Sequence, residues 1–169
     1  MAEQRALFLD RDGTINIDRH YVHKIEDFEP VPGIFELCAA AAAKGYALVV
    51  VTNQSGIERG YFTMEQYETL TTHMRGLFEQ HGCPLLDVLC CPHLNHPDRK
   101  PNPGMFLKAA AKWNINLAAS VSLGDKPRDV TAGAAAGVGA NYLLDAQATA
   151  CPGAAGIMAE PQQLIPLLS

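Results

Sequence analysis

The stretch Ala6–Thr14, ALFLDRDGT, runs from four apolar residues directly into two aspartates, Asp10 and Asp12, in a glycine-containing turn. A short apolar run without polar alternation is typical of a strand buried on both faces, as in a parallel sheet. Two carboxylates this close repel each other unless a cation neutralises them or one takes up a proton. A lone aspartate here would read as a turn former or a helix cap. The pair instead indicates Mg²⁺ with a phosphate group, because Mg²⁺ uses few carboxylates together with substrate phosphate oxygens.

Similar apolar runs recur along the chain and predict further buried strands. They lie at Ala47–Val51, Leu85–Leu89, Ser120–Leu123 and Asn141–Leu144. Helical patterns lie between them, at Gly33–Lys44, Thr63–His81, Pro103–Trp113 and Pro127–Ala136, with Gln162–Leu168 as a further candidate at the end. Strands that alternate with helices predict an α/β fold with a central parallel sheet. We expect a single domain over residues 1–169, because no repeat, low-complexity tract or linker interrupts this pattern.

Three polar clusters each follow a predicted strand. They are Asp10–Asp12, Thr52–Ser55 and Gly124–Lys126. In open α/β sheets, ligands bind beyond the carboxyl ends of the strands. We therefore expect the three clusters to converge on one pocket.

Composition and charge exclude several other classes of protein. The formal charge of −5 over 169 residues argues against a nucleic-acid or anionic-membrane binder, whereas a small phosphorylated substrate needs only local cations. No apolar run approaches the ~20 residues of a membrane span, and acidic residues within the first ten positions do not fit a secretory signal. Five cysteines without a repeating framework indicate free thiols. We expect a cytoplasmic monomer without nucleic-acid or membrane partners.

Four short motifs occur in order: DRDGT at 10–14, VVVTNQSG at 49–56, RKPNPGM at 99–105 and LGDKPRD at 123–129. Together they resemble the haloacid dehalogenase superfamily of aspartate-nucleophile phosphotransferases, over nearly the whole chain from Leu7 to Leu144. The resemblance implies a Rossmann-like α/β fold and a Mg²⁺-dependent phosphatase.

The resemblance also implies a role for each motif residue. Asp10 would be the nucleophile that forms an aspartyl-phosphate. Asp12 would protonate the leaving oxygen and then accept a proton from the hydrolytic water. Thr52 would bind phosphoryl oxygens, and Lys100 would neutralise charge on the nucleophile and the transferring group. Asp125 would hold Mg²⁺ together with Asp10 and the backbone carbonyl of Asp12.

Asp129 has two readings. It would orient its neighbours in the site, or it would only stabilise the helix dipole as a residue of the first turn.

The motifs most resemble the branch that contains the phosphatases of heptose 1,7-bisphosphate and histidinol phosphate. This implies hydrolysis of the C7 phosphate of D-glycero-D-manno-heptose 1,7-bisphosphate, on the path to lipopolysaccharide. The alternatives are a phosphatase of histidinol phosphate or another small ester, and a non-catalytic binding protein of the same fold. Members of this branch lack a large cap domain, and Ile15–Val31 and Gly56–Thr63 leave room here only for loops.

The same branch implies a set of substrate-binding positions. They are Asp18, Arg19, His20, Tyr21, Asn53, Gln54, Ser55, Arg99 and Lys126. For Arg19 and His20 the alternative is a solvated loop. Arg99 adjoins Lys100, and its guanidinium suits a second phosphate. Arg59 is a further candidate.

One feature of the branch is missing. Its members typically hold a structural zinc with a Cys-x-His pair and, after a short loop, a Cys-x-Cys pair before the Arg-Lys. This chain has Cys91-Pro92-His93 but no second cysteine pair. Cys90 and His96 would complete four ligands within seven residues, which crowds tetrahedral geometry. We expect a shortened loop without metal, with zinc at Cys91 and His93 as the alternative.

Overall fold

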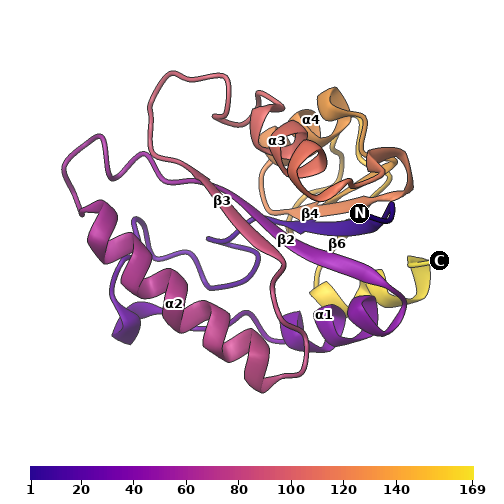
Figure 1. The fold of residues 1–169 in the computed structure, drawn as a ribbon, viewed down its shortest axis with the longest axis horizontal. Helices are drawn as coiled ribbons and strands as arrows, with labels where there is room; N and C mark the ends of the chain where they lie inside the picture. The colour runs from indigo at the N-terminus through magenta and orange to yellow at the C-terminus, as the bar shows by residue number, and fades with distance from the viewer.

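The computed structural model describes all residues from Met1 to Ser169, and its centre is a six-stranded sheet (Figure 1). The strands are β1 (Arg5–Leu9), β2 (Tyr46–Asn53), β3 (Asp87–Cys91), β4 (Val121–Gly124), β5 (Ala140–Leu144) and β6 (Gly156–Met158). Their spatial order is β3-β2-β1-β4-β5-β6, and every pairing is parallel. The predicted α/β architecture is confirmed, with β1 between β2 and β4.

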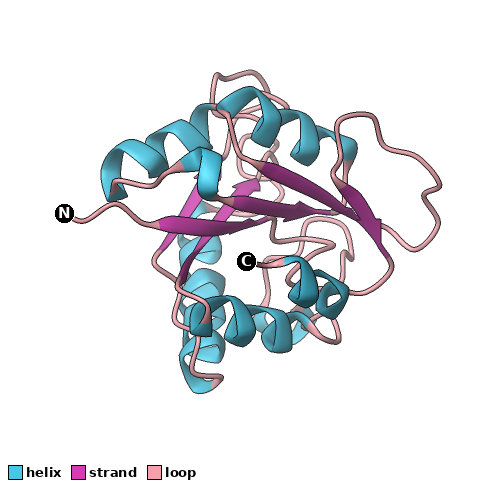
Figure 2. Cartoon of the chain, turned by 90° about the vertical axis from the view of Figure 1, so that its right-hand side faces the viewer, coloured by secondary structure: helices cyan, strands magenta, loops and turns pink.

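Helices cover both faces of the sheet, so the fold has three layers (Figure 2). The α-helices are α1 (Ile34–Ala43), α2 (Met64–Gln80), α3 (Gly104–Trp113) and α4 (Pro127–Ala136). Short 3-10 helices span Ile25–Asp27, Leu117–Ala119 and Pro161–Leu167. In Figure 1, α3 and α4 lie above the sheet, and α1, α2 and the C-terminal segment lie below it. No helix in the structure combines the length and the apolar character needed to cross a membrane.

Alternating side chains of the strands supply a hydrophobic core on each face. Leu7 and Leu9 of β1 belong to the larger cluster, which includes residues of α1, α2 and the C-terminal 3-10 helix. Ala6 and Phe8 point the other way, into a second cluster with residues of α3 and α4. Burial on both faces explains why the strands appear in the sequence as continuous apolar runs.

The helix boundaries follow their local signals closely. At the start of α2, the Thr63 hydroxyl accepts a hydrogen bond from the Gln66 N–H at 3.1 Å, and the Gln66 side chain accepts one from the Thr63 N–H at 2.8 Å. This capping box satisfies two N–H groups that have no partner within the helix. Gly45 follows α1 with φ of +85°, which is a conformation that favours glycine.

Three expectations about the elements need correction. The third strand is Asp87–Cys91, two residues later than Leu85–Leu89, because the Asp87 carboxylate is satisfied by Lys112 Nζ (2.8 Å) and Trp113 Nε1 (2.7 Å) and can therefore start a strand. The edge strand β6 has only three residues and was not predicted. The C-terminal helix is a 3-10 helix that contains Pro166, whose missing N–H does not fit an α-helical hydrogen-bond pattern.

The segments that follow β1 and β2 are loops and not an inserted domain. Only loops and the 3-10 helix Ile25–Asp27 lie between β1 and α1, and the connection between β2 and α2 is ten residues long, from 54 to 63. The fold therefore has no large cap domain, as predicted.

Candidate active site

A cavity of about 350 Å³ lies where β1 and β2 end and where the turn after β4 begins. It is lined by Asp10, Asp12, Asp18, His20, Tyr21, Asn53, Gln54, Ser55, Arg59, Arg99, Lys126 and Arg128. These residues come from all three polar clusters of the sequence. The prediction that the clusters converge on one pocket is confirmed.

Lys100 contacts Asp10 from below the cavity. Its side chain is buried, and Nζ donates hydrogen bonds to Asp10 Oδ1 at 2.9 Å and to the Val51 carbonyl at 2.7 Å. A second carboxylate, Asp129 Oδ1, lies 2.7 Å from the same Nζ as an ion pair. Burial alone would lower the pKa of Lys100, but Asp10 and Asp129 outweigh it and raise that pKa above its ordinary value. Lys100 therefore remains a cation.

Asn53 fixes the backbone of Lys100. The Asn53 side chain accepts a hydrogen bond from the Lys100 N–H at 2.9 Å and donates one to the Lys100 carbonyl at 3.0 Å. Because Asn53 is the last residue of β2, this reciprocal pair attaches the Lys100 loop directly to the sheet.

Three carboxylates meet beside this ammonium. One oxygen atom from each of Asp10, Asp125 and Asp129 lies within 4.8 Å of the others. Burial raises the pKa of Asp10 well above its ordinary value, the charges of Asp129 and Asp125 raise it further, and Lys100 opposes them. Burial also raises the pKa of Asp125. A second ammonium, Lys126 Nζ, lies 3.4 Å from Asp125 Oδ2. Two ammonium groups among three carboxylates still leave an excess of negative charge, which is what a divalent cation would relieve.

Two further observations fit a cation at this cluster. Asp125 Oδ1 is buried and has no hydrogen-bond partner in the protein. Gly13, with φ of +89°, approaches Asp125 so closely that an added Cβ would lie 2.2 Å from Oδ2. The turn thus packs its backbone against the Asp125 carboxylate, whose oxygens are the kind of ligand that Mg²⁺ prefers.

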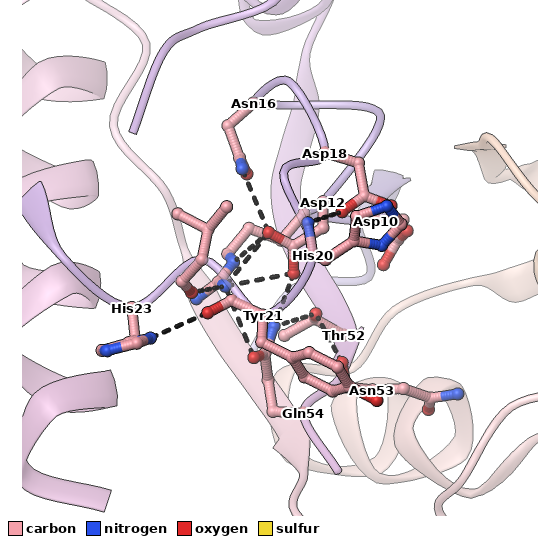
Figure 3. A network of polar contacts seen from close by, with 12 residues as sticks. Asp10, Asp12, Asn16, Asp18, His20, Tyr21, His23, Thr52, Asn53 and Gln54 are labelled. Atoms are coloured by element: carbon pink, nitrogen blue, oxygen red, sulfur yellow. Dashed lines mark hydrogen bonds and ion pairs between the residues drawn. The ribbon is translucent and has the colours of Figure 1, made fainter. Parts of the chain in front are cut away.

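Three residues donate hydrogen bonds to the Asp12 carboxylate, which lines the cavity. Asn16 Nδ2 reaches Oδ1 at 3.0 Å and Gln54 Nε2 reaches Oδ2 at 2.9 Å, from opposite sides in Figure 3. Arg11 forms an ion pair with the same carboxylate at 3.0 Å. Gln54 also donates to Thr52 Oγ1 at 2.9 Å, so the buried Thr52 hydroxyl belongs to the same network.

The loop after the first motif supplies one wall of the cavity. Asp18 Oδ1 accepts the His20 N–H at 2.9 Å, and His20 and Tyr21 both have positive φ, at 60° and 57°. These two consecutive left-handed residues turn His20 and Tyr21 into the cavity. Arg19 does not line it, because its guanidinium pairs with Glu29 on the surface. For Arg19 the structure therefore favours the alternative of a solvated loop.

Two functional candidates were missed in the sequence. Arg11 lies between the two aspartates of the first motif, and its side chain is buried against Asp12. Arg128 lines the cavity from the first turn of α4, and its position inside LGDKPRD was the available signal.

Hydrogen bonds hold the shortened loop before Lys100. Cys91 is buried with its Sγ 3.8 Å from the His93 carbonyl, to which Arg99 Nη1 also donates at 3.4 Å. The Leu94 N–H donates to Glu58, which belongs to the loop after β2. The side chains Cys90, Cys91, His93 and His96 form no group of three metal-ligand atoms within 4.8 Å; Asp10, Asp125 and Asp129 form the one such group.

Comparisons with known proteins agree with this arrangement. Residues 1–137 match the family model of the haloacid dehalogenase-like hydrolases. The D-glycero-alpha-D-manno-heptose-1,7-bisphosphate 7-phosphatase of Burkholderia mallei is 43% identical over 99% of this chain and 95% of its own. The D-glycero-beta-D-manno-heptose-1,7-bisphosphate 7-phosphatase of Escherichia coli K12 is 45% identical over 82% of this chain and 78% of its own.

Solved structures show the same relationship. The D,D-heptose 1,7-bisphosphate phosphatase of B. bronchiseptica, complexed with magnesium and phosphate, superposes with a TM-score of 0.88 at 28% identity over 98% of both chains. A putative haloacid dehalogenase-like phosphatase of Mesorhizobium loti gives a TM-score of 0.87 at 34% identity over 98% of this chain and 86% of its own. The chain therefore belongs to the haloacid dehalogenase-like hydrolases and, within them, to the family of heptose-1,7-bisphosphate 7-phosphatases, which are phosphoric monoester hydrolases.

Proposed function

We propose that this chain hydrolyses the C7 phosphate of D-glycero-D-manno-heptose 1,7-bisphosphate through an aspartyl-phosphate on Asp10. The observation that carries the proposal is the contact of Asp10 with the buried ammonium of Lys100, at the floor of a cavity lined almost entirely by polar side chains. The substrate follows from the relatives, whose names specify the 7-phosphatase reaction.

In the first step, a carboxylate oxygen of Asp10 attacks phosphorus, and the bond between phosphorus and the sugar oxygen breaks. Asp12 gives its proton to that leaving oxygen, which departs as the C7 hydroxyl. Lys100 balances negative charge on Asp10 and on the transferring group, and a positioned cation of this kind stabilises the transition state electrostatically.

In the second step, water attacks phosphorus of the aspartyl-phosphate and Asp12 accepts a proton from that water. The acyl-phosphate bond breaks, inorganic phosphate leaves, and Asp10 is restored as a carboxylate. The Thr52 hydroxyl, which accepts a hydrogen bond from Gln54 at the end of β2, would bind a phosphoryl oxygen in both steps.

Mg²⁺ would be held by Asp10, Asp125 and the backbone carbonyl of Asp12, and would neutralise phosphoryl charge when bound. We assign Asp129 to Lys100 rather than to the metal, because its Oδ1 forms the ion pair with Nζ and its Oδ2 accepts the Lys126 N–H at 3.0 Å.

A second phosphate would be bound by the arginines at the rim of the cavity. Arg59, Arg99 and Arg128 all line it, and none of them forms an ion pair with a carboxylate of this chain. Three unpaired guanidinium groups exceed what one reacting phosphate requires, whereas a bisphosphate brings two dianionic groups. The loop residues Asp18, His20 and Tyr21 would contact the sugar between them.

A kinetic panel tests the substrate. The substrates are both anomers of heptose 1,7-bisphosphate, fructose 1,6-bisphosphate and histidinol phosphate. We expect kcat/KM for one heptose anomer to exceed that for histidinol phosphate and fructose 1,6-bisphosphate by about 100-fold or more, because a site built for hydroxyl and phosphate contacts rejects ligands that leave them unpaired. Similar values across the panel would contradict the heptose assignment and leave a general phosphatase. Sedimentation of the same sample would test the expected monomer.

A further inference from the structure

Arg11 is a buried arginine directly behind the cavity. Its side chain is only 1% exposed and is among the largest fully buried side chains of the protein. Unlike Asp10 and Asp12 on either side of it, Arg11 does not line the cavity. It therefore acts on the site only through the residues that it touches.

Two nitrogens of the Arg11 guanidinium donate hydrogen bonds to the Asp12 carboxylate. Nη2 lies 3.1 Å from Oδ1 and 3.0 Å from Oδ2, and Nε lies 3.3 Å from Oδ1. Nη2 also donates to the Val22 carbonyl at 2.6 Å, and the guanidinium carbon lies 6.0 Å from the centre of the Tyr67 ring. The loop after β1 and helix α2 thus both constrain Arg11.

The other partners of Asp12 do not constrain it in the same way. Asn16 binds only Oδ1 and Gln54 binds only Oδ2, each through a single hydrogen bond. A carboxylate held by two single bonds can still tilt about the line that joins its oxygens. The planar fork of an arginine restricts that tilt, because two nitrogens of one rigid group reach the same carboxylate.

We propose that Arg11 is a positioning residue that fixes the orientation of the Asp12 carboxylate for proton transfer to the leaving oxygen. The proposal rests on the function proposed above for Asp12. It assigns to Arg11 no contact with substrate. It predicts that loss of Arg11 slows the first chemical step more for a substrate whose departing oxygen must be protonated than for a substrate whose oxygen can leave as an anion.

Phenyl phosphate and p-nitrophenyl phosphate provide the test, because they differ in one nitro group and in how much protonation the departing oxygen needs. The rate constant for release of the phenol in a single turnover is measured by stopped-flow absorbance, which isolates the first chemical step. For Arg11→Met we expect a loss of about 10- to 100-fold with phenyl phosphate and of less than about threefold with p-nitrophenyl phosphate, as for a partly lost general acid. Arg11→Lys should show the same pattern with a smaller loss, because the ammonium keeps the positive charge but not the planar fork.

Two other variants calibrate the result. Asp12→Asn should show the same substrate dependence as Arg11→Met, with a larger loss. Arg75→Met removes another arginine that pairs with an aspartate, Asp87, far from the cavity, and should leave both rates near wild type. If Arg11→Met does not fold, the Arg11→Lys rates decide.

Equal losses on both substrates, or no loss on either, would overturn the role of Arg11 while leaving that of Asp12 intact. If Asp12→Asn itself shows no substrate dependence, the proposed role of Asp12 fails and the inference fails with it.

Discussion

Asp129 Oδ1 lies 2.7 Å from Nζ of Lys100, so a residue in the first turn of α4 holds the cation that contacts Asp10. Asp129 is itself buried, and its other oxygen caps the start of α4 by accepting the Lys126 N–H. The sequence left two interpretations of Asp129 open. Its ion pair with Lys100 favours the first, that it orients its neighbours in the site. Its hydrogen bond at the start of α4 stabilises the helix as well.

Asp129→Asn tests this link between α4 and the nucleophile. The amide keeps the shape and can still accept from Lys126, but it no longer balances the ammonium. We expect kcat to fall by about 10- to 100-fold with little change in KM, because Lys100 loses one of its two carboxylate partners. Asp145→Asn, outside the cavity, is the matched control. Unchanged kcat for Asp129→Asn would mean that Asp10 and the Val51 carbonyl are enough to position Lys100.

The approach of Gly13 to Asp125 predicts a defect in metal binding on Gly13→Ala. The new Cβ would lie 2.2 Å from Asp125 Oδ2, in a backbone conformation with φ of +89°. Gly45→Ala is the control, since φ is +85° there and no atom lies within 4 Å of the new Cβ. Both variants should lose about 1–2 kcal/mol of stability from the left-handed backbone, measured by urea unfolding.

Only Gly13→Ala should also weaken Mg²⁺ binding, measured as the increase of Tm with added Mg²⁺. Equal Mg²⁺ responses in the two variants would show that the close approach of Gly13 plays no part in the metal site.

The raised pKa of Asp10 predicts how stability depends on pH in the metal-free protein. A carboxyl whose pKa is raised by folding favours the folded state at low pH, and this contribution is lost as pH rises through the folded pKa. In EDTA, the Tm of wild type should therefore fall relative to Asp10→Asn as pH rises above the ordinary carboxyl pKa of about 4.

Added Mg²⁺ should reverse this loss at neutral pH for wild type and much less for Asp10→Asn, because a ligand that binds only the folded state stabilises it. A constant difference in Tm between the two proteins at all pH values would contradict the charge crowding described at the site. The same Asp10→Asn protein should have no measurable turnover.

Arg99 should matter for the phosphate that does not react. Arg99→Ala is expected to raise KM for heptose 1,7-bisphosphate by about 10- to 100-fold and to change KM for a heptose 7-monophosphate by less than about threefold. Arg99→Lys should recover part of the affinity, since it restores the charge without the bidentate geometry. Equal effects on the two substrates would place Arg99 at the reacting phosphate instead.

The sequence predicted the sheet well because its signals are local. Apolar runs mark buried strands, and Thr63 and Pro127 mark helix starts through bonds to neighbours three residues away or through a fixed φ. The convergence of Asp10, Thr52 and Asp125 could be predicted as well, since parallel strands end at the same edge of the sheet.

Side-chain direction within a turn could not be predicted. Arg19 and His20 are adjacent and both polar, yet two positive φ values send His20 into the cavity and leave Arg19 beside Glu29. The contact of Arg11 with Val22 likewise depends on the path of a loop, and the sequence of that loop has no hydrophobic periodicity from which its path could be predicted. Long-range partners of this kind are set by packing, and no spacing rule encodes them.

The groups assigned to chemistry and to recognition are attached to different parts of the molecule. Asp10, Thr52 and Asp125 belong to strand ends or to the residue just beyond them, where the hydrogen bonds of the sheet fix the backbone. Asp18, His20, Arg59 and Arg99 belong to loops. The loop that carries Arg59 is joined to the loop that carries Arg99 by a hydrogen bond from the Leu94 N–H to the Glu58 side chain. Evolution can therefore exchange the substrate of such an enzyme by altering loops, while the phosphate-transferring apparatus is inherited unchanged.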